Sequence, residues 1–263
     1  MRFTVSSTAL SSKLNALAKV INSKNSLPIL ADFLFDIQDN VLYLTASDSE
    51  NVINTQMELT ESDANGRFAI NNHDLLEAIK GFSEQPITFD VNLQDNIAKI
   101  SYQNGLFSLP VENADEYPQS QPITEGINTI VMPSNVLADN INRSLFATAQ
   151  DELRPVMNGI YFDLTPEHLA VVASDGHKLV RNKVFTVQSE QPASFILPKK
   201  PAGLLKNLLQ KDGGDVEIKF NERNAEINYG DGRLSCRLIE GRYPNYNSVI
   251  PQNNTNTLTV DRL

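Results

Sequence analysis

The chain contains 263 residues, of which 41% are hydrophobic and 21% are charged. This composition is typical of a globular protein and excludes extensive disorder, and the length suffices for two domains that each bury a core. The formal net charge of −10 argues against a protein that binds nucleic acid with its whole surface. A small basic surface on an acidic protein remains compatible with this value, because net charge does not say where the charges lie.

Several features of the sequence bear on its location. No apolar run approaches the roughly 20 residues that span a bilayer, and residues 1–5 alternate as in a strand rather than forming the apolar core of a signal peptide. The single cysteine, Cys236, excludes a disulfide framework and suits a reducing compartment. These features predict a cytoplasmic protein.

In chain order, the pattern predicts a strand, an amphipathic helix and three strands, and then the same series again. The first helix has a stripe of Leu10, Leu14, Leu17 and Ile21 behind a serine cap at position 6 or 7, and the second covers about 72–80 behind Asn71 or Asn72. The predicted strands cover 1–6, 33–37, 41–45, 52–59, 68–70, 87–93, 97–102 and 106–110. Residues 61–66 are predicted as a loop, and the acidic, proline-containing residues 112–126 as a linker.

After the linker the same order of elements returns. Ser134 is predicted to cap a third helix that contains Leu137, Ile141 and Leu145, and a polar loop is predicted over 148–156. A fourth helix is predicted around residues 204–209. The predicted strands cover 128–132, 160–164, 168–173, 180–185, 195–197, 216–220 and 225–229.

The two series are copies of one another. Asp175 follows Asp48 by 127 residues, and Leu197 follows Ile70 by the same interval. The sequence therefore predicts one unit over 1–122 and a second over 127–252. Residues 256–263 resemble the opening strand of each unit, which predicts the first strand of a third, missing unit and a natural protein longer than this chain.

The polar corner Ser174-Asp175-Gly176-His177 contains the residue types of a hydrolase triad. Triad members normally come from distant segments, and no nucleophile elbow, metal-spaced His/Cys cluster or phosphate-binding glycine run accompanies this corner. Its copy, Ala46-Ser47-Asp48, indicates a repeated structural turn instead. We therefore expect no enzyme activity, metal or cofactor, with a hydrolase that uses Asp175 and His177 as the alternative.

The repeat and several short motifs together resemble the bacterial DNA sliding clamp, the beta subunit of DNA polymerase III. Each motif alone is weak, but they run in order from end to end of the chain. They are Met1-Arg2-Phe3-Thr4-Val5, Leu27-Pro28-Ile29-Leu30, Asn158-Gly159, Ser174-Asp175-Gly176-His177-Lys178-Leu179, Pro198-Lys199-Lys200 and Gly241-Arg242-Tyr243-Pro244-Asn245-Tyr246.

The resemblance implies an α+β DNA-clamp fold with helices on one side and sheets on the other. It implies a homodimeric ring that encircles duplex DNA without reading its sequence. The ring tethers the replicative polymerase, and the clamp loader and repair proteins bind it through a short hydrophobic peptide. It also implies a peptide pocket, with an ordinary hairpin corner as the alternative. The implied pocket residues are Met157, Ser174, Gly176, His177, Lys178, Leu179, Pro244, Ser248 and Val249.

For DNA, the resemblance implies contacts from Lys24, Lys199 and Lys200, and from Gln150 and Arg154 in the loop 148–156. Such contacts reach phosphates and carry no sequence information. A solvated loop is the alternative for the lysines. The acidic neighbours Asp151 and Glu152, and Pro155-Val156 where the family often has tyrosines, leave DNA contact by the loop open.

At the implied subunit interface, Phe107 and Leu109 match apolar positions where the first domain meets the third domain of the partner. Without a third unit we expect this chain not to close the dimeric ring and to leave the edge near 106–109 unpaired. A stand-alone peptide-binding module with no role on DNA is a further alternative.

Overall fold

The structure is a computed structural model that describes residues 1–22, 27–118, 122–209 and 213–261. The described part of the first repeat contains two α-helices among nine strands. The helices are α1 (Ser7–Leu17) and α2 (Asn72–Ile79). The strands are β1 (Arg2–Ser6), β2 (Asp32–Gln38), β3 (Val41–Ser47), β4 (Asn51–Glu58), β5 (Glu61–Ser62), β6 (Gly66–Asn71), β7 (Pro86–Asn92), β8 (Ile97–Tyr102) and β9 (Gly105–Glu112).

In its described residues, the second repeat has the same order of elements without a counterpart of β5. Its helices are α3 (Ser134–Ser144) and α4 (Lys199–Leu208). Its strands are β10 (Asn128–Pro133), β11 (Gly159–Leu164), β12 (Leu169–Ser174), β13 (Leu179–Val184), β14 (Ala193–Pro198), β15 (Asp215–Phe220), β16 (Asn224–Tyr229) and β17 (Gly232–Arg237). The predicted strand–helix–three-strand series is therefore confirmed in all four halves.

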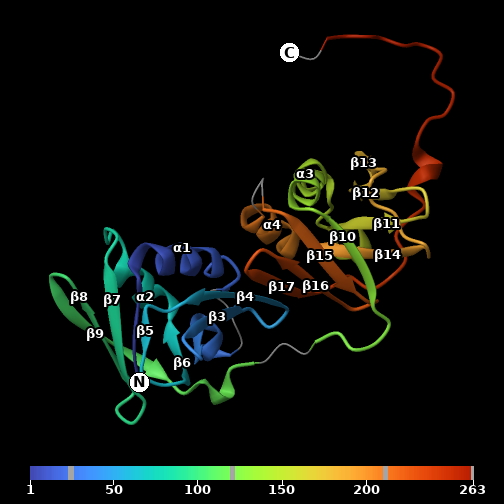
Figure 1. Ribbon diagram of the computed structural model, residues 1–263. Helices are drawn as coiled ribbons and strands as arrows, with labels where there is room; N and C mark the ends of the chain where they lie inside the picture. Colours follow the sequence, from blue (N-terminus) through green and yellow to red (C-terminus); the bar gives the residue numbers. More distant parts are fainter. Residues whose placement is uncertain (23–26, 119–121, 210–212, 262–263) are drawn as a thin grey trace.

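The strands form two antiparallel sheets in the described part of the chain. A long sheet has the order β10-β15-β16-β17-β4-β3-β2-β6-β9-β8-β7-β1-β5, and a smaller one has the order β13-β12-β11-β14. The long sheet continues from one repeat into the other because β17 pairs with β4, which places Leu234 opposite Ile53. The α1, α4 and α3 helices lie along one side of the molecule, and the β4 and β17 strands lie side by side at its middle (Figure 1).

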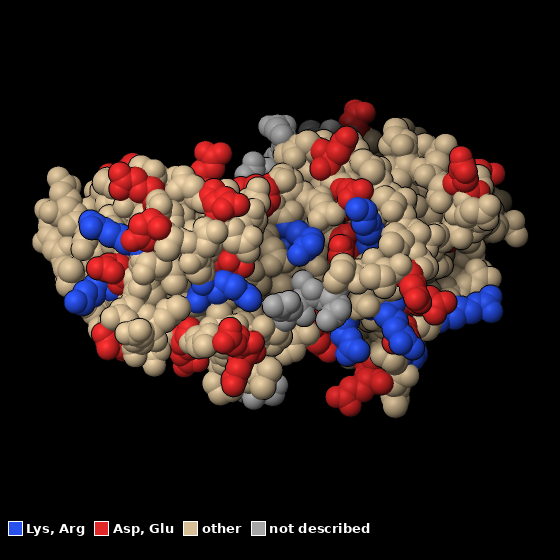
Figure 2. Space-filling view, turned by 60° about the horizontal axis from the view of Figure 1, so that its bottom comes forward, with Lys and Arg blue, Asp and Glu red and all other residues tan. Residues whose placement is uncertain are grey.

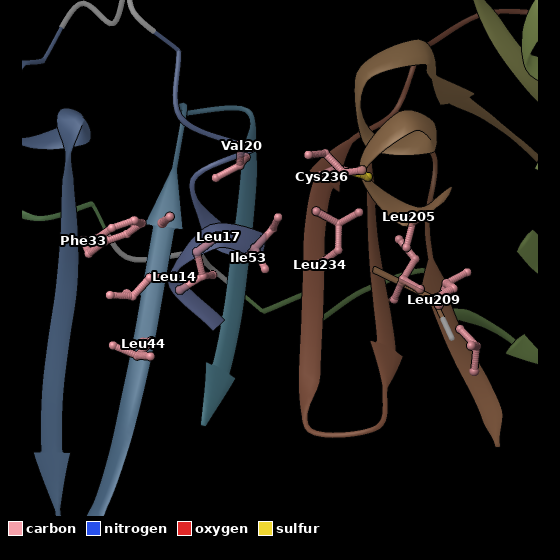
Figure 3. Packing of buried hydrophobic residues seen from close by; sticks show 14 of the residues in the cluster. Leu14, Leu17, Val20, Phe33, Leu44, Ile53, Leu205, Leu209, Leu234 and Cys236 are labelled. Atoms are coloured by element: carbon pink, nitrogen blue, oxygen red, sulfur yellow. The ribbon is translucent and has the colours of Figure 1, made fainter. Parts of the chain in front are cut away.

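The core follows the apolar patterns of the sequence. Leu10, Leu14 and Leu17 on α1 are fully buried, as are the inward-facing residues of the strands that α1 covers. The close-up in Figure 3 shows Ile53 of the first repeat and Leu234 of the second facing one another across the boundary between the repeats. The two repeats thus share one apolar interior.

Helix starts show where local sequence is a good guide and where it is not. Ser6 caps α1, because its hydroxyl accepts a hydrogen bond from the Ala9 amide, and Asn71 caps α2 in the same way. The predicted Ser134 cap is wrong: α3 begins at Ser134 itself, behind Pro133. The backbone amide of Ser134 donates to the carbonyl of Gly214, so a distant segment performs the capping role.

Three other boundaries differ from the prediction. The first helix ends at Leu17, so Ile21 lies beyond it, although it still packs against the core. Part of the predicted loop 61–66 is the short strand β5, which gains hydrogen bonds from β1. The strand predicted at 256–263 is not formed over 256–261, where no described strand pairs with it; 262–263 lie outside the described residues. An isolated strand lacks the neighbour that would satisfy its backbone.

Candidate functional site

The corner between β12 and β13 is a tight turn organised by Asp175. Its carboxylate accepts hydrogen bonds from the backbone amides of His177 and Lys178, each at 3.0 Å, and forms an ion pair with Lys178 Nζ at 3.1 Å. The amide bonds, with the lysine, hold the pKa of Asp175 well below its usual range. Gly176 has a φ of +90°, a conformation that glycine adopts most easily.

This geometry does not support the hydrolase alternative. The Asp175 oxygen that would orient a catalytic histidine is occupied by the two backbone amides of its own turn. The Ser174 hydroxyl accepts a hydrogen bond from the Gly176 amide at 3.1 Å, so it too serves the turn. In the described residues, no group of three His, Cys, Asp or Glu side chains is arranged to hold a metal ion.

A cavity of about 440 Å³ opens beside this corner, and three separate segments line it. It brings together eight of the nine residues predicted for the peptide pocket: Met157, Ser174, Gly176, His177, Lys178, Leu179, Pro244 and Val249. The ninth, Ser248, does not line it. Its hydroxyl donates to the Asn245 carbonyl at 2.7 Å and closes the turn that carries Val249.

Aromatic side chains support the cavity from below. Tyr243 and Tyr246 line it, and Tyr243 stacks on Tyr161 at 4.7 Å between ring centroids. The Tyr246 hydroxyl donates to an oxygen of Asp163 at 2.8 Å. Burial raises the pKa of both lining tyrosines to about 12, so they remain neutral phenols at physiological pH. The aromatic part of the cavity lining is therefore uncharged.

The cavity lining includes both charged and apolar residues. Arg154 lines the cavity and is held by Asp151, with Nε 2.8 Å from the carboxylate. Lys178 lies over the ring of Phe146 at 5.7 Å. Val249, which also lines the cavity, is 67% exposed and leaves an open apolar surface. This combination of apolar floor and few polar groups is typical of a site for a small ligand or peptide.

Arg154 is a residue of the cavity. The resemblance grouped it with the DNA contacts, which stays a prediction, and the structure places its guanidinium over Gly176. Tyr243, Asn245 and Tyr246 were absent from the predicted pocket, although they belong to the motif at 241–246. The available signal was their position in the motif, because Tyr243 directly precedes the predicted Pro244 and Tyr246 follows it by two residues.

The other predicted DNA contacts are spread over the molecule. Gln150 is exposed, Lys199 begins α4 and is partly exposed, and Lys24 lies outside the described residues. Lys200 already has partners: its ammonium group donates to the Asp48 carboxylate and to the Val20 carbonyl of the other repeat, the latter at 2.8 Å. Burial alone would raise the pKa of Asp48, but the hydrogen bonds from Lys200 and Asn51 lower it.

On the face shown in Figure 2, the described Lys and Arg residues are interspersed with Asp and Glu and do not gather into one basic patch. Phe107 and Leu109 are half-buried on β9, and β9 pairs with β8 along its length but with β6 only at Val111 and Glu112. In the described chain, the remaining edge of β9 is without a partner strand.

The duplicated units, the sheet that runs through both and the helices along one side define a protein of the DNA-clamp class. Comparison with known families identifies which family of this class the chain belongs to. Residues 1–121 match the model of the DNA polymerase III beta subunit, N-terminal domain, and residues 131–245 match that of the central domain. The chain belongs to the DNA polymerase III beta subunit family, the bacterial sliding clamps, whose members are polymerase processivity factors and not enzymes.

Individual relatives agree with this assignment. The beta sliding clamp of Haemophilus influenzae is 28% identical over 255 residues, which cover 97% of this chain and 69% of that protein. The crystal structure of the DnaN sliding clamp of Pseudomonas aeruginosa bound to griselimycin has a TM-score of 0.90 at 24% identity and shares the fold over 97% of this chain and 69% of that one. The crystal structure of the Bartonella birtlesii clamp bound to griselimycin has a TM-score of 0.87 at 25% identity. The match covers 97% of this chain and 69% of that one.

Proposed function

We propose that this chain acts as a sliding clamp that holds a DNA polymerase on duplex DNA through the cavity at the β12–β13 corner. The observation that carries the proposal is the convergence at this cavity of Met157, Leu179 and Val249, which come from separate segments. They form an apolar floor between polar His177 and Arg154 at the rim, and this arrangement suits a short peptide with apolar side chains.

The test uses griselimycin, the compound bound in the structures of two relatives. Val249→Asp places a carboxylate in the apolar part of the cavity, and we expect at least about a tenfold loss of affinity by calorimetry, because an unpaired charge is costly to desolvate. Val131→Asp is the matched control, since Val131 is also more than half exposed but lies on β10. Equal affinity of Val249→Asp and the unsubstituted chain would contradict the proposal.

The DNA-facing side is proposed to be the side of the helices. Lys199 and Lys200 lie at the start of α4, and Gln150 lies in the loop after α3. Phosphate contacts make DNA binding depend on salt. Lys199→Glu is therefore expected to weaken DNA binding and to reduce the slope of log K against log salt concentration by about one. Arg154 belongs to the cavity in this proposal, so Arg154→Ala is expected to weaken griselimycin binding while leaving that salt dependence unchanged.

The assembly and location are part of the same proposal. A ring of two head-to-tail subunits around DNA, in the cytoplasm, suits a processivity factor, and Phe107 and Leu109 are proposed to lie at a subunit interface. In the described residues, no helix combines the length and apolar character needed to cross a membrane. A stand-alone peptide-binding module is distinguished by loading on circular DNA: linearising the DNA releases a ring but does not affect a simple peptide binder.

A further inference from the structure

The polar corner of the first repeat has the same backbone structure as its copy in the second. The Asp48 carboxylate accepts hydrogen bonds from two backbone amides of its own turn. The Ser49 amide donates to the Ser47 hydroxyl at 3.1 Å, and the Gly176 amide donates to the Ser174 hydroxyl at the same distance. Ser49 has a φ of +79°, close to the +90° of Gly176, although this left-handed conformation costs a serine more than a glycine. The two corners therefore present the same backbone frame to their surroundings.

A cavity of about 220 Å³, here named the junction cavity, opens beside the first corner. One wall comes from the first repeat and consists of Ser47, Ser49, Glu50, Val52, Pro118 and Ile123. The opposite wall comes from β16 and β17 of the second repeat. Cys236, which Figure 3 shows at the boundary between the repeats, belongs to that opposite wall. The junction cavity is thus lined from both repeats of this chain.

The first-repeat wall corresponds residue by residue to the cavity at the β12–β13 corner. A shift of 127 residues (174 − 47) takes the four corner residues to their copies, and a shift of 126 (244 − 118) does so for Pro118 and Ile123. The copies are Ser174, Gly176, His177, Leu179, Pro244 and Val249, and all of them line the cavity at the β12–β13 corner. Duplication has thus produced one wall of a binding cavity twice.

The junction cavity is smaller than its copy because part of the space is filled. Leu30 and Tyr117 correspond to Met157 and Tyr243, but they do not line the junction cavity. They are at most 3% exposed and pack in a separate apolar cluster of the first repeat. The two volumes are about 220 Å³ and about 440 Å³. The smaller volume suits a small molecule rather than several side chains of a peptide.

Charged side chains of both signs line the junction cavity. Glu50 and Arg237 are neighbours across the boundary, because the Arg237 amide donates to the Glu50 carbonyl at 3.1 Å. Among the described residues, neither side chain forms an ion pair or a hydrogen bond. A second carboxylate, that of Glu226, accepts a hydrogen bond from the Ile123 amide at 3.0 Å through one of its oxygens. The lining therefore offers two carboxylates and one guanidinium to a ligand.

The balance of these groups selects the charge of the ligand. A simple anion would meet two carboxylates, and a simple cation would leave the Arg237 guanidinium without a partner, which is costly in a desolvated site. A zwitterion satisfies both signs, because its ammonium group can pair with Glu50 or Glu226 and its carboxylate with Arg237. Val52 and Ile123 add an apolar surface against which a compact side chain can pack.

We propose that the junction cavity is a second binding site, which takes a small zwitterion such as a free amino acid with a compact apolar side chain. The ammonium group binds Glu50 and Glu226, the carboxylate binds Arg237, and the side chain packs against Val52 and Ile123. Because the two walls belong to different repeats, the ligand joins the repeats to each other. A ligand that binds only the folded chain also raises its melting temperature.

Valine is the probe, and two of its fragments are matched controls. Isobutylamine lacks the carboxylate of valine, and isovalerate lacks the ammonium group. In NMR titrations of the isotope-labelled chain, valine is expected to shift the amide signals of Ser49, Glu50 and Arg237 in a saturable way. Each fragment is expected to bind at least about tenfold more weakly, because one charged group of the cavity then has no partner.

Two substitutions remove one charge each without changing the size of the side chain greatly. Glu50→Gln and Arg237→Gln, both at exposed positions, are expected to weaken valine binding at least about tenfold. Glu77→Gln on α2 and Arg143→Gln on α3 are exposed controls away from the cavity and are expected to bind valine normally. Circular dichroism establishes that each variant is folded.

Griselimycin separates this proposal from the function proposed for the cavity at the β12–β13 corner, since valine is expected not to compete with it. The proposal is overturned if valine produces no saturable shift up to its solubility limit. It is also overturned if isobutylamine or isovalerate binds as tightly as valine, or if folded Glu50→Gln and Arg237→Gln bind valine like the unsubstituted chain.

Discussion

Asp32 provides a test of how burial controls the stability of the first repeat. This residue begins β2, is only 6% exposed and accepts a hydrogen bond from the Asn71 amide at 3.2 Å. Burial is the main reason that its pKa rises to about 6, and the nearby Glu112 adds to the effect, while the Asn71 hydrogen bond opposes it. At neutral pH the folded protein therefore carries a charge that its surroundings disfavour.

The magnitude follows from the difference between the folded and unfolded states. The ordinary pKa is 3.8, so the folded state binds this proton more tightly by about two pKa units. Each unit corresponds to about 1.36 kcal/mol, which makes about 3 kcal/mol an upper value and about 1–3 kcal/mol the expected range. The stabilisation from the bound proton is fully present below pH 3.8 and is lost as the pH rises through about 6.

Asp32→Asn keeps the shape and the acceptor oxygen but removes the titration. We expect the variant to be about 1–3 kcal/mol more stable than the unsubstituted chain at pH 7.5 in urea unfolding, with the difference shrinking steadily toward pH 4. Comparing the two proteins at each pH cancels the titration of the other carboxylates. A difference that stays constant between pH 4 and pH 7.5, or a variant that is less stable at pH 7.5, would refute the reasoning.

Three further substitutions test the junction and the cavity. Ile53→Ala, at a site 1% exposed, is expected to cost about 2–5 kcal/mol in urea unfolding, and a loss below 1 kcal/mol would argue against a packed junction. Asp48→Asn removes a carboxylate whose pKa is lowered, so its destabilisation relative to the unsubstituted chain should be present at pH 7 and disappear as the pH falls below about 4. Gly176→Ala, at φ +90° with its Cβ 3.3 Å from Arg154 Nη1, should cost about 1–2 kcal/mol in thermal unfolding and weaken griselimycin binding. Gly203→Ala, within α4, should do neither, because no described atom lies within 4 Å of the added Cβ.

Much of the fold could be predicted because it follows from local patterns. Alternating apolar residues located the strands, and the stripe at Leu10, Leu14 and Leu17 located the buried face of α1. The cap at Asn71 was also predictable, because its side chain bonds to amides two and three residues away. The features that were missed depend on distant segments: Gly214 supplies the acceptor at the start of α3, and β5 forms only because β1 lies beside it.

The site shows the same division between features that the local sequence predicts and features that depend on contacts formed on folding. Ser174, Met157 and Gly176 to Leu179 were predicted through the resemblance, and the structure places them around one cavity. The sequence did not indicate that Arg154 turns toward that cavity, since its direction depends on the ion pair with Asp151. Nor did it indicate that Lys200 crosses to the other repeat, because Asp48 is 152 residues away in the chain and becomes its partner only after folding.

The two copies of the polar corner show how one local structure serves two purposes. In both copies, an aspartate carboxylate accepts hydrogen bonds from two backbone amides and fixes the turn. Asp48 accepts from the amides of Glu50 and Asn51, and Asp175 accepts from the amides of His177 and Lys178. In the first copy, the second carboxylate oxygen receives Lys200 from the other repeat, and the corner becomes part of the junction. In the second, that oxygen receives Lys178 of its own turn, and the corner borders the cavity.

Duplication therefore explains why a structural junction and a binding site have the same scaffold. In the first copy the carboxylate of the turn joins the two repeats through Lys200, and in the second the equivalent carboxylate holds Lys178 at the edge of the cavity.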